Sequence, residues 1–246
     1  MAVIFTESYF YAPDLKGPRI LLDPDESHHL FRVLRLNTGD TVSVSDGLGR
    51  LAACRVEGRE KDRAVLGVES VSDAVSGEPE ITLAAGLIRK NQFELLVELA
   101  SQLPVTRIIP FTSANTSVNP GFMEKALSRL NEKALCALKQ SKKVHVTRVE
   151  GLATFDGILE SGAHFDAACL FEKLDSGQDK VDAEALRAAK RVLAVTGPEG
   201  GFNADEVAQA KQKGFRILGL GQGRLRAEAA AFAATVNLLT YKGSLS

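Results

Sequence analysis

Two patterns of hydrophobic and polar positions follow one another along this chain. Up to about residue 75, short runs such as 41–45, 50–56 and 64–71 are separated by turn residues, which predicts β-strands. Further along, apolar strands alternate with segments whose apolar residues recur at helical spacing. A polar stretch separates the two patterns. The chain is therefore predicted to contain a small β-barrel domain over residues 1–75 and an α/β domain over residues 76–246.

The β-rich part is expected to contain one hairpin and one short helix. An Asp-Gly pair directly after residue 45 predicts the hairpin turn. The short helix is expected to open at Asp25 or Ser27 and to carry Arg32 and Arg35 on one face. Most such arginine pairs are solvated surface charges, but these two are also candidates for contacts with phosphate.

The second part alternates strands with helices, which is typical of a parallel sheet covered on both faces. The predicted strands are 81–87, 105–111, 166–171, 191–196 and 215–218, and the predicted helices are 92–103, 121–142, 203–213 and 227–241. Asn203 and Glu206 have the spacing of a capping box at the start of the third helix. The last helix has no polar stripe after Glu228, so we expect it to be buried on most sides.

Two glycine-rich turns leave strands and enter helices near the end of the chain. The first is Thr196-Gly197-Pro198-Glu199-Gly200-Gly201, and the second is Leu218-Gly219-Leu220-Gly221, which continues to Leu225. Glycines let a ligand approach the backbone, and both turns are expected at the ligand-binding edge of the sheet. These residues are therefore the candidate cofactor-binding set. The glycine spacing is GxGxG rather than GxGxxG and no later strand carries an acidic residue, which excludes a dinucleotide fingerprint.

Composition narrows the partners that are expected. The 246 residues are 45% hydrophobic and 25% charged, with a net charge of -1, so any surface for nucleic acid must be local. No apolar run approaches the roughly 18 residues that span a membrane, and no signal peptide is recognised, so a cytoplasmic protein is expected. Isolated cysteines, and a His28-His29 pair without further ligands, give no reason to expect a metal.

The densest basic segment is Lys139-Gln140-Ser141-Lys142-Lys143, at the end of the long predicted helix. Lysines near a helix C-terminus interact favourably with the helix dipole, so a solvated helix end is one interpretation. The amide and hydroxyl groups within the run also suit a contact with RNA. Lys142 and Lys143 are the candidates for that contact.

Three motifs occur in a fixed order along nearly the whole chain. The first is His29-Leu30-Phe31-Arg32-Val33-Leu34-Arg35 with Gly39-Asp40 and Asp46-Gly47 after it. The second is Gly197-Pro198-Glu199-Gly200-Gly201-Phe202 followed by Glu206, and the third runs from Leu220-Gly221 to Leu225-Arg226 and Glu228. Together they resemble the motifs of the RsmE family of bacterial 16S ribosomal RNA methyltransferases, in the SPOUT superfamily. Gly223 and Ala229 stand where many members have arginine and threonine.

The resemblance implies a PUA-like barrel followed by an α/β domain with a trefoil knot. It also implies a homodimer with S-adenosyl-L-methionine pockets at the subunit interface. The implied reaction is methylation of N3 of a uridine in 16S ribosomal RNA, with that RNA or the 30S subunit as partner. Two alternatives stay open, a SPOUT methyltransferase for another rRNA or tRNA base and a non-catalytic RNA-binding protein of the same fold.

Uracil N3 becomes nucleophilic only when it loses its proton, which places negative charge on the flanking carbonyl oxygens. A cation beside those oxygens would stabilise that charge. Arg226 or Arg224 is the candidate cation, and Glu228 is the candidate for orienting it. Arg32 and Arg35, together with Lys142 and Lys143, are the candidates for holding the flanking RNA backbone.

Overall fold

The computed structural model describes residues 8–73, 80–172, 182–221 and 223–243, and the chain forms two compact units. The first unit comprises Met1–Gly77 and Leu138–Val146, and the second comprises Glu78–Ala137 and Thr147–Ser246. The first unit is therefore discontinuous in sequence, because a short stretch from the middle of the chain belongs to it.

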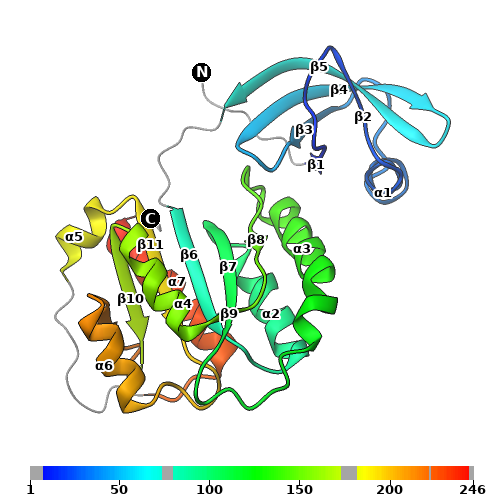
Figure 1. Ribbon diagram of the computed structural model, residues 1–246. Coiled ribbons are helices and arrows are strands. Elements are labelled where there is room, and N and C mark those ends of the chain that lie inside the picture. The colour runs from blue at the N-terminus through cyan, green and yellow to red at the C-terminus, as the bar shows by residue number, and fades with distance from the viewer. Residues whose placement is uncertain (1–7, 74–79, 173–181, 222, 244–246) are drawn as a thin grey trace. The chain divides into compact units, whose positions relative to one another are not determined.

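Unit 1 is built on a five-stranded mixed sheet in the order β1-β3-β4-β5-β2 (Figure 1). The strands are β1 Tyr9–Tyr11, β2 Arg19–Leu21, β3 Thr41–Ser45, β4 Arg50–Glu60 and β5 Arg63–Asp73. The predicted hairpin is confirmed, since β3 and β4 pair antiparallel with Ser45 opposite Leu51. The parallel pairing of β1 with β3 makes the sheet mixed. Its core includes Phe10, Leu30, Val44 and Leu66, all fully buried.

The short helix of unit 1 begins earlier than expected. In α1 (Pro24–His28) the Asp23 side chain caps the N–H of Glu26 and proline occupies the first turn, so the start predicted at Asp25 or Ser27 is wrong. The chain continues as a π-helix over His29–Val33. Arg35 follows with φ of 56°, in the left-handed region. Arg32 and Arg35 therefore do not share a helix face, because the helix has ended before Arg35.

The stretch Leu138–Val146 packs into unit 1 through backbone and side-chain contacts. The Tyr9 hydroxyl donates to the Lys143 carbonyl at 2.5 Å, and the Val146 N–H donates to the Gly47 carbonyl at 2.8 Å. Lys139 forms an ion pair with the buried carboxylate of Glu26. The last turn of α3 (Phe122–Ser141) is thus part of the unit formed by the N-terminal sheet.

Unit 2 contains a parallel sheet with the path β12-β10-β11-β6-β7-β8, and β9 also pairs with β7. The strands are β6 Glu80–Gly86, β7 Val105–Thr112, β8 Arg148–Val149, β9 Ala153–Thr154, β10 Ala167–Phe171, β11 Arg191–Thr196 and β12 Arg216–Leu218. Phe171 lies beside Thr196 on one side and Leu218 on the other. The carboxyl ends of β10, β11 and β12 therefore lie at the same edge, as the sequence predicted.

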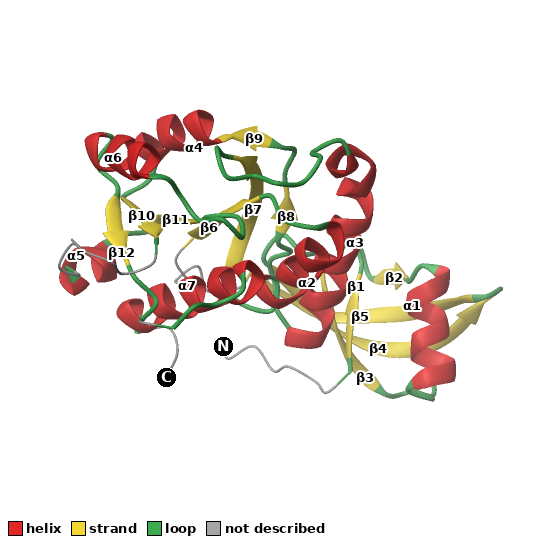
Figure 2. Ribbon diagram, turned by 90° about the horizontal axis from the view of Figure 1, so that it is seen from below, coloured by secondary structure: helices red, strands yellow, loops and turns green. Residues whose placement is uncertain are grey.

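Helices cover both faces of this sheet (Figure 2). The helices are α2 Lys90–Ala100, α3 Phe122–Ser141, α4 Phe155–Ser161, α5 Ala183–Ala188, α6 Ala204–Gln212 and α7 Ala227–Lys242, with a 3-10 turn at Gly162–His164. Successive β11 residues alternate between two cores. Ala194 packs with residues of α2, α3, α5 and α7, whereas Val195 packs with residues of α4 and α6. This alternation is what a parallel strand buried on both faces requires.

The ends of two helices test the sequence predictions directly. The capping box of α6 is confirmed, because the Asn203 side chain accepts from the Glu206 N–H and the Glu206 side chain accepts from the Asn203 N–H. One face of helix α7 is buried along the helix, with Ala231, Ala234 and Leu238 in the core, and most of the residues between them are half-buried. None of the helices in the described ranges is long and apolar enough to cross a membrane.

Candidate functional site

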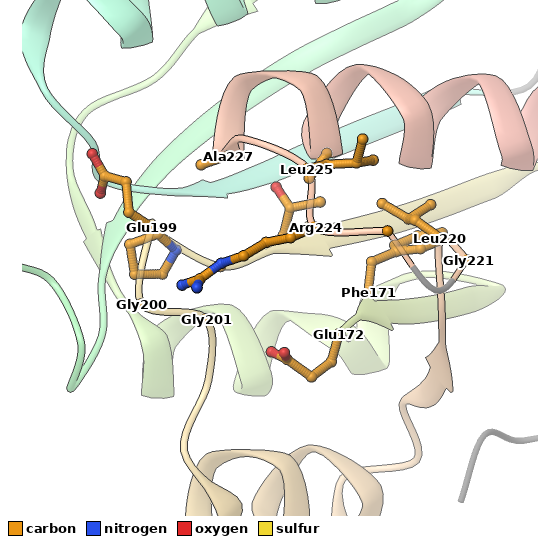
Figure 3. Close-up of a pocket in the computed structure, with 15 residues that line it drawn as sticks. Phe171, Glu172, Glu199, Gly200, Gly201, Leu220, Gly221, Arg224, Leu225 and Ala227 are labelled. Carbon is orange, nitrogen blue, oxygen red and sulfur yellow. The ribbon is translucent and has the colours of Figure 1, made fainter. Parts of the chain in front are cut away.

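A cavity of about 320 Å³ opens at the carboxyl edge of the parallel sheet, beside the ends of β10 and β11 (Figure 3). It is lined by Phe171, Glu172, Thr196, Gly197, Pro198, Glu199, Gly200, Gly201, Leu220, Gly221, Gly223, Arg224, Leu225, Ala227 and Ala230. Its volume lies within the range of small-molecule sites. Both glycine turns contribute, so the prediction that they line one pocket is consistent with the fold.

The first glycine turn is held by close contacts with the end of β6 and with the loop after β7. A Cβ on Gly86, at the end of β6, would lie 2.3 Å from the Pro198 nitrogen, so only glycine fits beneath the turn. The Asn115 side-chain amide donates to the carbonyls of Gly200 and Gly201 at 3.1 Å and 3.2 Å. The turn is therefore fixed by Gly86 of the adjacent strand β6 and by Asn115 of the loop after β7, both distant from it in sequence.

Glu172 is a lining residue that the sequence analysis missed. Its carboxylate accepts a hydrogen bond of 2.9 Å from the Phe202 N–H, at the end of the first glycine turn. Its own N–H donates to the Leu218 carbonyl at 2.9 Å, where the second turn begins. Glu172 directly follows the strand predicted to end at Phe171. An acidic residue at the carboxyl end of a strand was therefore the signal that could have found it.

The second glycine turn supplies the opposite wall. Gly221 has φ of 100°, a conformation that favours glycine, and Leu220 and Leu225 present apolar side chains. Of the predicted cofactor residues, Leu218 and Gly219 do not line the cavity. Leu218 is 3% exposed and packs in the core of the sheet. The other nine predicted positions all line it.

The candidate catalytic residues occupy three different environments. Arg224 lines the cavity, and Figure 3 shows its side chain extending toward the first glycine turn. Arg226 is exposed and is the N-cap residue of α7, without a side-chain capping bond. Glu228 lies in the first turn of α7, is 6% exposed, and its Oε2 has no hydrogen-bond partner among the described residues. Neither Arg226 nor Glu228 lines the cavity.

The four candidate RNA-binding residues all belong to unit 1. Arg32, Arg35 and Lys142 are exposed, and Lys143 is half-buried. Lys142 has φ of 52° and lies just beyond the end of α3. The residues of the basic run thus differ in role, because Lys139 forms an ion pair with the Glu26 carboxylate.

Two cysteines lie in the cores rather than at a reactive site. Burial raises the pKa of the Cys54 thiol and of the Cys169 thiol to about 12, so both remain protonated at neutral pH. Cys169 lies in β10, two residues before the end of the strand at the cavity. In the part of the chain that the structure describes, no group of three or more metal-ligating side chains is present.

The comparisons with known proteins agree with this architecture. A family model described as an RNA methyltransferase domain matches residues 76–239, and an RNA methyltransferase PUA domain matches residues 22–69. Ribosomal RNA small subunit methyltransferase E of Mycobacterium tuberculosis is 30% identical over 249 residues, covering 96% of this chain and 94% of the relative. The chain belongs to the methyltransferase E family.

Another relative of the methyltransferase E family and a solved structure of the family are also similar to this chain over nearly its whole length. The Bacillus subtilis protein of the same name is 26% identical and covers 94% of this chain and 93% of its own. The structure of the Neisseria gonorrhoeae methyltransferase E bound to S-adenosyl methionine has a TM-score of 0.82 at 24% identity, covering 95% of this chain and 97% of that one. The predicted fold, a PUA-like unit followed by a SPOUT-type parallel-sheet domain, is therefore confirmed.

Proposed function

We propose that this protein transfers a methyl group from S-adenosyl-L-methionine to N3 of a uridine in 16S ribosomal RNA of the small subunit. The observation that carries the proposal is the cavity between the two glycine turns, in a chain that belongs to the methyltransferase E family. Relatives in this family are named as small-subunit ribosomal RNA methyltransferases, and two solved structures are described with S-adenosyl methionine bound.

The residues of the cavity fit this cofactor chemically. The cofactor has an apolar adenine face, which suits Phe171, Leu220 and Leu225. Its amino-acid end has an ammonium and a carboxylate group, which suit the side chains of Glu172 and Arg224. The glycines leave the backbone open to close approach. When bound, the cofactor supplies an electrophilic methyl group, and the protein supplies position and electrostatics.

The chain's own residues are assigned to activating the uracil. As N3 loses its proton, negative charge develops on the neighbouring carbonyl oxygens. The Arg226 guanidinium, exposed where the second turn enters α7, is placed by this proposal beside one of those oxygens. Glu228, two residues later in the first turn, is assigned to orienting the arginine. Arg224, which lines the cavity, is assigned to cofactor binding and is the second candidate cation.

Binding of the substrate RNA is assigned to four basic residues of unit 1. Arg32, Arg35, Lys142 and Lys143 supply phosphate contacts, which position the RNA without choosing the base. The target uridine must be unstacked, because RNA bases are read mainly in single-stranded regions.

A homodimer is part of the proposal. Helix α7 is apolar around most of its circumference, and Leu225, two residues before its start, is 44% exposed beside the cavity. A closed two-fold dimer would cover such a surface. Light scattering at micromolar concentration should give twice the mass of the 26.4 kDa chain, and a stable monomer would remove the dimer from the proposal.

Methylation mapping tests the reaction itself. Small-subunit rRNA from a strain lacking the gene is expected to lose one N3-methyluridine, which mass spectrometry of nuclease fragments would detect. The purified protein with S-adenosyl-L-methionine should restore it. Restoration of a different modified base, or methylation of tRNA instead, would redirect the proposal to another target. If the rRNA of the strain lacking the gene has lost no modification, the protein does not have this activity.

A further inference from the structure

A second, open pocket of about 640 Å³ lies in unit 2, and none of the residues assigned above lines it. Arg89 and Lys90, at the start of α2, line one side of it. Asn119, Phe122 and Lys125, at the start of α3, line the other. These five residues define what we call the basic pocket. None of them was singled out from the sequence, because the two groups are about 30 positions apart.

The charges of the basic pocket are of one sign. Arg89, Lys90 and Lys125 are all exposed, and no acidic residue lines the pocket with them. Among the residues that the structure describes, none of the three cations forms an ion pair. This protein has a net charge near zero, and on such a protein the surface cations are commonly interspersed with acidic side chains. Three cations that line one pocket without an acidic residue therefore favour an anionic ligand.

The start of α2 adds backbone donors to these cations. Helix α2 has 11 residues, no side-chain cap at Arg89, and no acidic residue in its first turn. The positive end of a helix dipole normally favours negative charge, so Arg89 and Lys90 are unfavourably placed in the absence of an anion. An anion in the pocket would be attracted by the cations and by the uncapped N–H groups together.

Asn119 contributes a neutral donor to the same pocket. Its Oδ1 accepts a hydrogen bond of 2.9 Å from the Gly121 N–H, inside the loop before α3. The acceptor end of the amide is therefore engaged, and the Nδ2 group has no hydrogen bond among the described residues. The pocket thus combines three cations with an amide donor, which is a set that matches phosphate oxygens.

Both walls of the basic pocket are attached to the first glycine turn of the cofactor cavity. Arg89 follows Gly86 by three residues, so their Cα atoms are at most about 11 Å apart, and Gly86 packs directly beneath Pro198. On the other wall, Asn115 donates to Gly200 and precedes Asn119 by four residues. Short chain segments therefore connect both walls of the basic pocket to the first glycine turn.

We infer that the basic pocket holds a backbone phosphate of the substrate RNA, close to the nucleotide that is methylated. The inference rests on the proposed function and adds an RNA contact within the α/β unit to those assigned to unit 1. The exposure of all three cations suits a polymer that continues past the pocket on both sides. A free phosphate or a small phosphorylated metabolite would instead require donors that enclose it.

The test replaces the three cations and measures RNA binding by the full-length protein. The variant Arg89→Gln/Lys90→Gln/Lys125→Gln should bind a small-subunit rRNA fragment more weakly in fluorescence anisotropy. Its plot of log affinity against log salt should be shallower by about 0.7 for each phosphate that the protein no longer neutralises. The variant Arg187→Gln/Lys190→Gln/Lys213→Gln is the matched control, because it removes the same charge from exposed residues of unit 2 that line neither pocket.

The outcomes separate this inference from the proposed function. Both variants should keep wild-type affinity for S-adenosyl-L-methionine in calorimetry. The pocket variant should melt at or above the wild-type temperature, because Arg89 and Lys90 oppose the dipole of α2 in the absence of an anion. If the wild type methylates rRNA and the two variants have equal salt slopes, the inference is wrong and the proposed function stands. If the wild type neither binds nor methylates rRNA, the proposed function fails and the inference falls with it. Binding of inorganic phosphate that is abolished in the triple variant, without any change in RNA affinity, would identify a small-anion site instead.

Discussion

The Glu172 carboxylate accepts a 2.9 Å hydrogen bond from the backbone N–H of Phe202. The residue that follows β10 thereby holds the end of the first glycine turn, which follows the neighbouring strand β11. A Cβ on Gly201 would lie only 3.2 Å from both carboxylate oxygens, so the turn and the acid fit closely. The conformation of the cavity between the two glycine turns therefore depends on a side chain that belongs to neither glycine motif.

Replacement of Glu172 should loosen the first glycine turn. Hydrogen bonds to charged groups contribute about 1.5 kcal/mol or more, which corresponds to a fall in Tm of roughly 3–6 °C for a chain of this size. Glu172→Ala is expected to show such a fall and a weaker affinity for S-adenosyl-L-methionine in calorimetry. Glu172→Gln, which keeps an acceptor oxygen, should lie between it and the wild type. Glu184→Ala, an exposed change on α5, is the control, and wild-type cofactor affinity in Glu172→Ala would contradict the assigned role.

A methyl group on Gly86 should disturb the same turn from below. In Gly86→Ala the new Cβ would meet the backbone nitrogen of Pro198 at 2.3 Å and the Gly197 carbonyl carbon at 2.7 Å, and backbone atoms cannot rotate away. Overpacking of this kind typically costs roughly 1–3 kcal/mol. We expect lower stability in urea titrations and weaker cofactor binding. Gly151→Ala has nothing within 4 Å of the new Cβ and should behave as wild type.

The two arginines of the second turn should separate binding from chemistry. Arg224 lines the cavity, so Arg224→Ala is expected to weaken cofactor affinity. Arg226 does not line it, so Arg226→Ala should leave cofactor affinity nearly unchanged. Loss of one preorganised donor typically slows turnover roughly 100- to 1000-fold, and single-turnover rates on small-subunit RNA would measure this. A normal rate for Arg226→Ala would transfer the catalytic assignment to Arg224.

The basic run at the end of α3 should divide into a structural and an RNA-binding part. Lys139→Ala leaves the Glu26 carboxylate, whose side chain is 5% exposed, without its cation, and thermal stability should fall. Lys142 is exposed and forms no ion pair in the described chain, so Lys142→Ala should keep the melting temperature while RNA affinity decreases. Equal effects of both substitutions on stability would argue against this division.

The three cysteines should differ sharply in reactivity. Cys136 is exposed, whereas Cys54 and Cys169 are buried, with thiol pKa values raised from 9.0 to about 12. A thiol reagent at pH 8 should label one cysteine in the native protein and three in denaturant, and Cys136→Ser should abolish the fast reaction. Because the unfolded chain loses these two thiol protons near pH 9 while the native chain keeps them, stability should fall as the pH rises from 9 to 12.

The features predicted correctly from the sequence are those with local signals. The capping box of α6 needs only Asn203 and Glu206, and the hairpin of unit 1 needs only an Asp-Gly turn between alternating runs. The two glycine turns were predicted because each combines flexible residues with a strand before and a helix after. Such patterns are fixed by backbone geometry within a few residues.

The features that were missed arise from strand order. Gly86 meets Pro198 because β6 pairs with β11, and Glu172 meets Phe202 because β10 pairs with β11 on its other side. No periodicity in the sequence specifies these neighbours. Strands of two or three residues, such as β2, β8 and β9, are too short to produce a pattern. The trefoil knot implied by the family resemblance, likewise a matter of connection order, stays a prediction.

Because unit 1 is discontinuous in sequence, its function cannot be tested by simply truncating the N-terminal residues. Removing residues 1–75 would take away the partners of Leu138–Val146, including the Tyr9 hydroxyl and the Gly47 carbonyl. A truncated chain would therefore expose a helix end that is normally packed, and its loss of RNA binding would not be specific. Charge substitutions in the full chain avoid this difficulty.

The same arrangement sets a sequence of events during protein synthesis. A domain encoded by one continuous stretch can fold as soon as that stretch leaves the ribosome. Here the N-terminal sheet emerges first, but unit 1 remains incomplete until Val146 has been translated, since Gly47 and Gly49 hydrogen-bond to Val146 and Val144. Synthesis of β6, α2, β7 and most of α3 therefore comes between the two segments of unit 1. Its completion during translation is delayed past the midpoint of the chain, when β6 and β7 have been made but β8 to β12 of the parallel sheet have not.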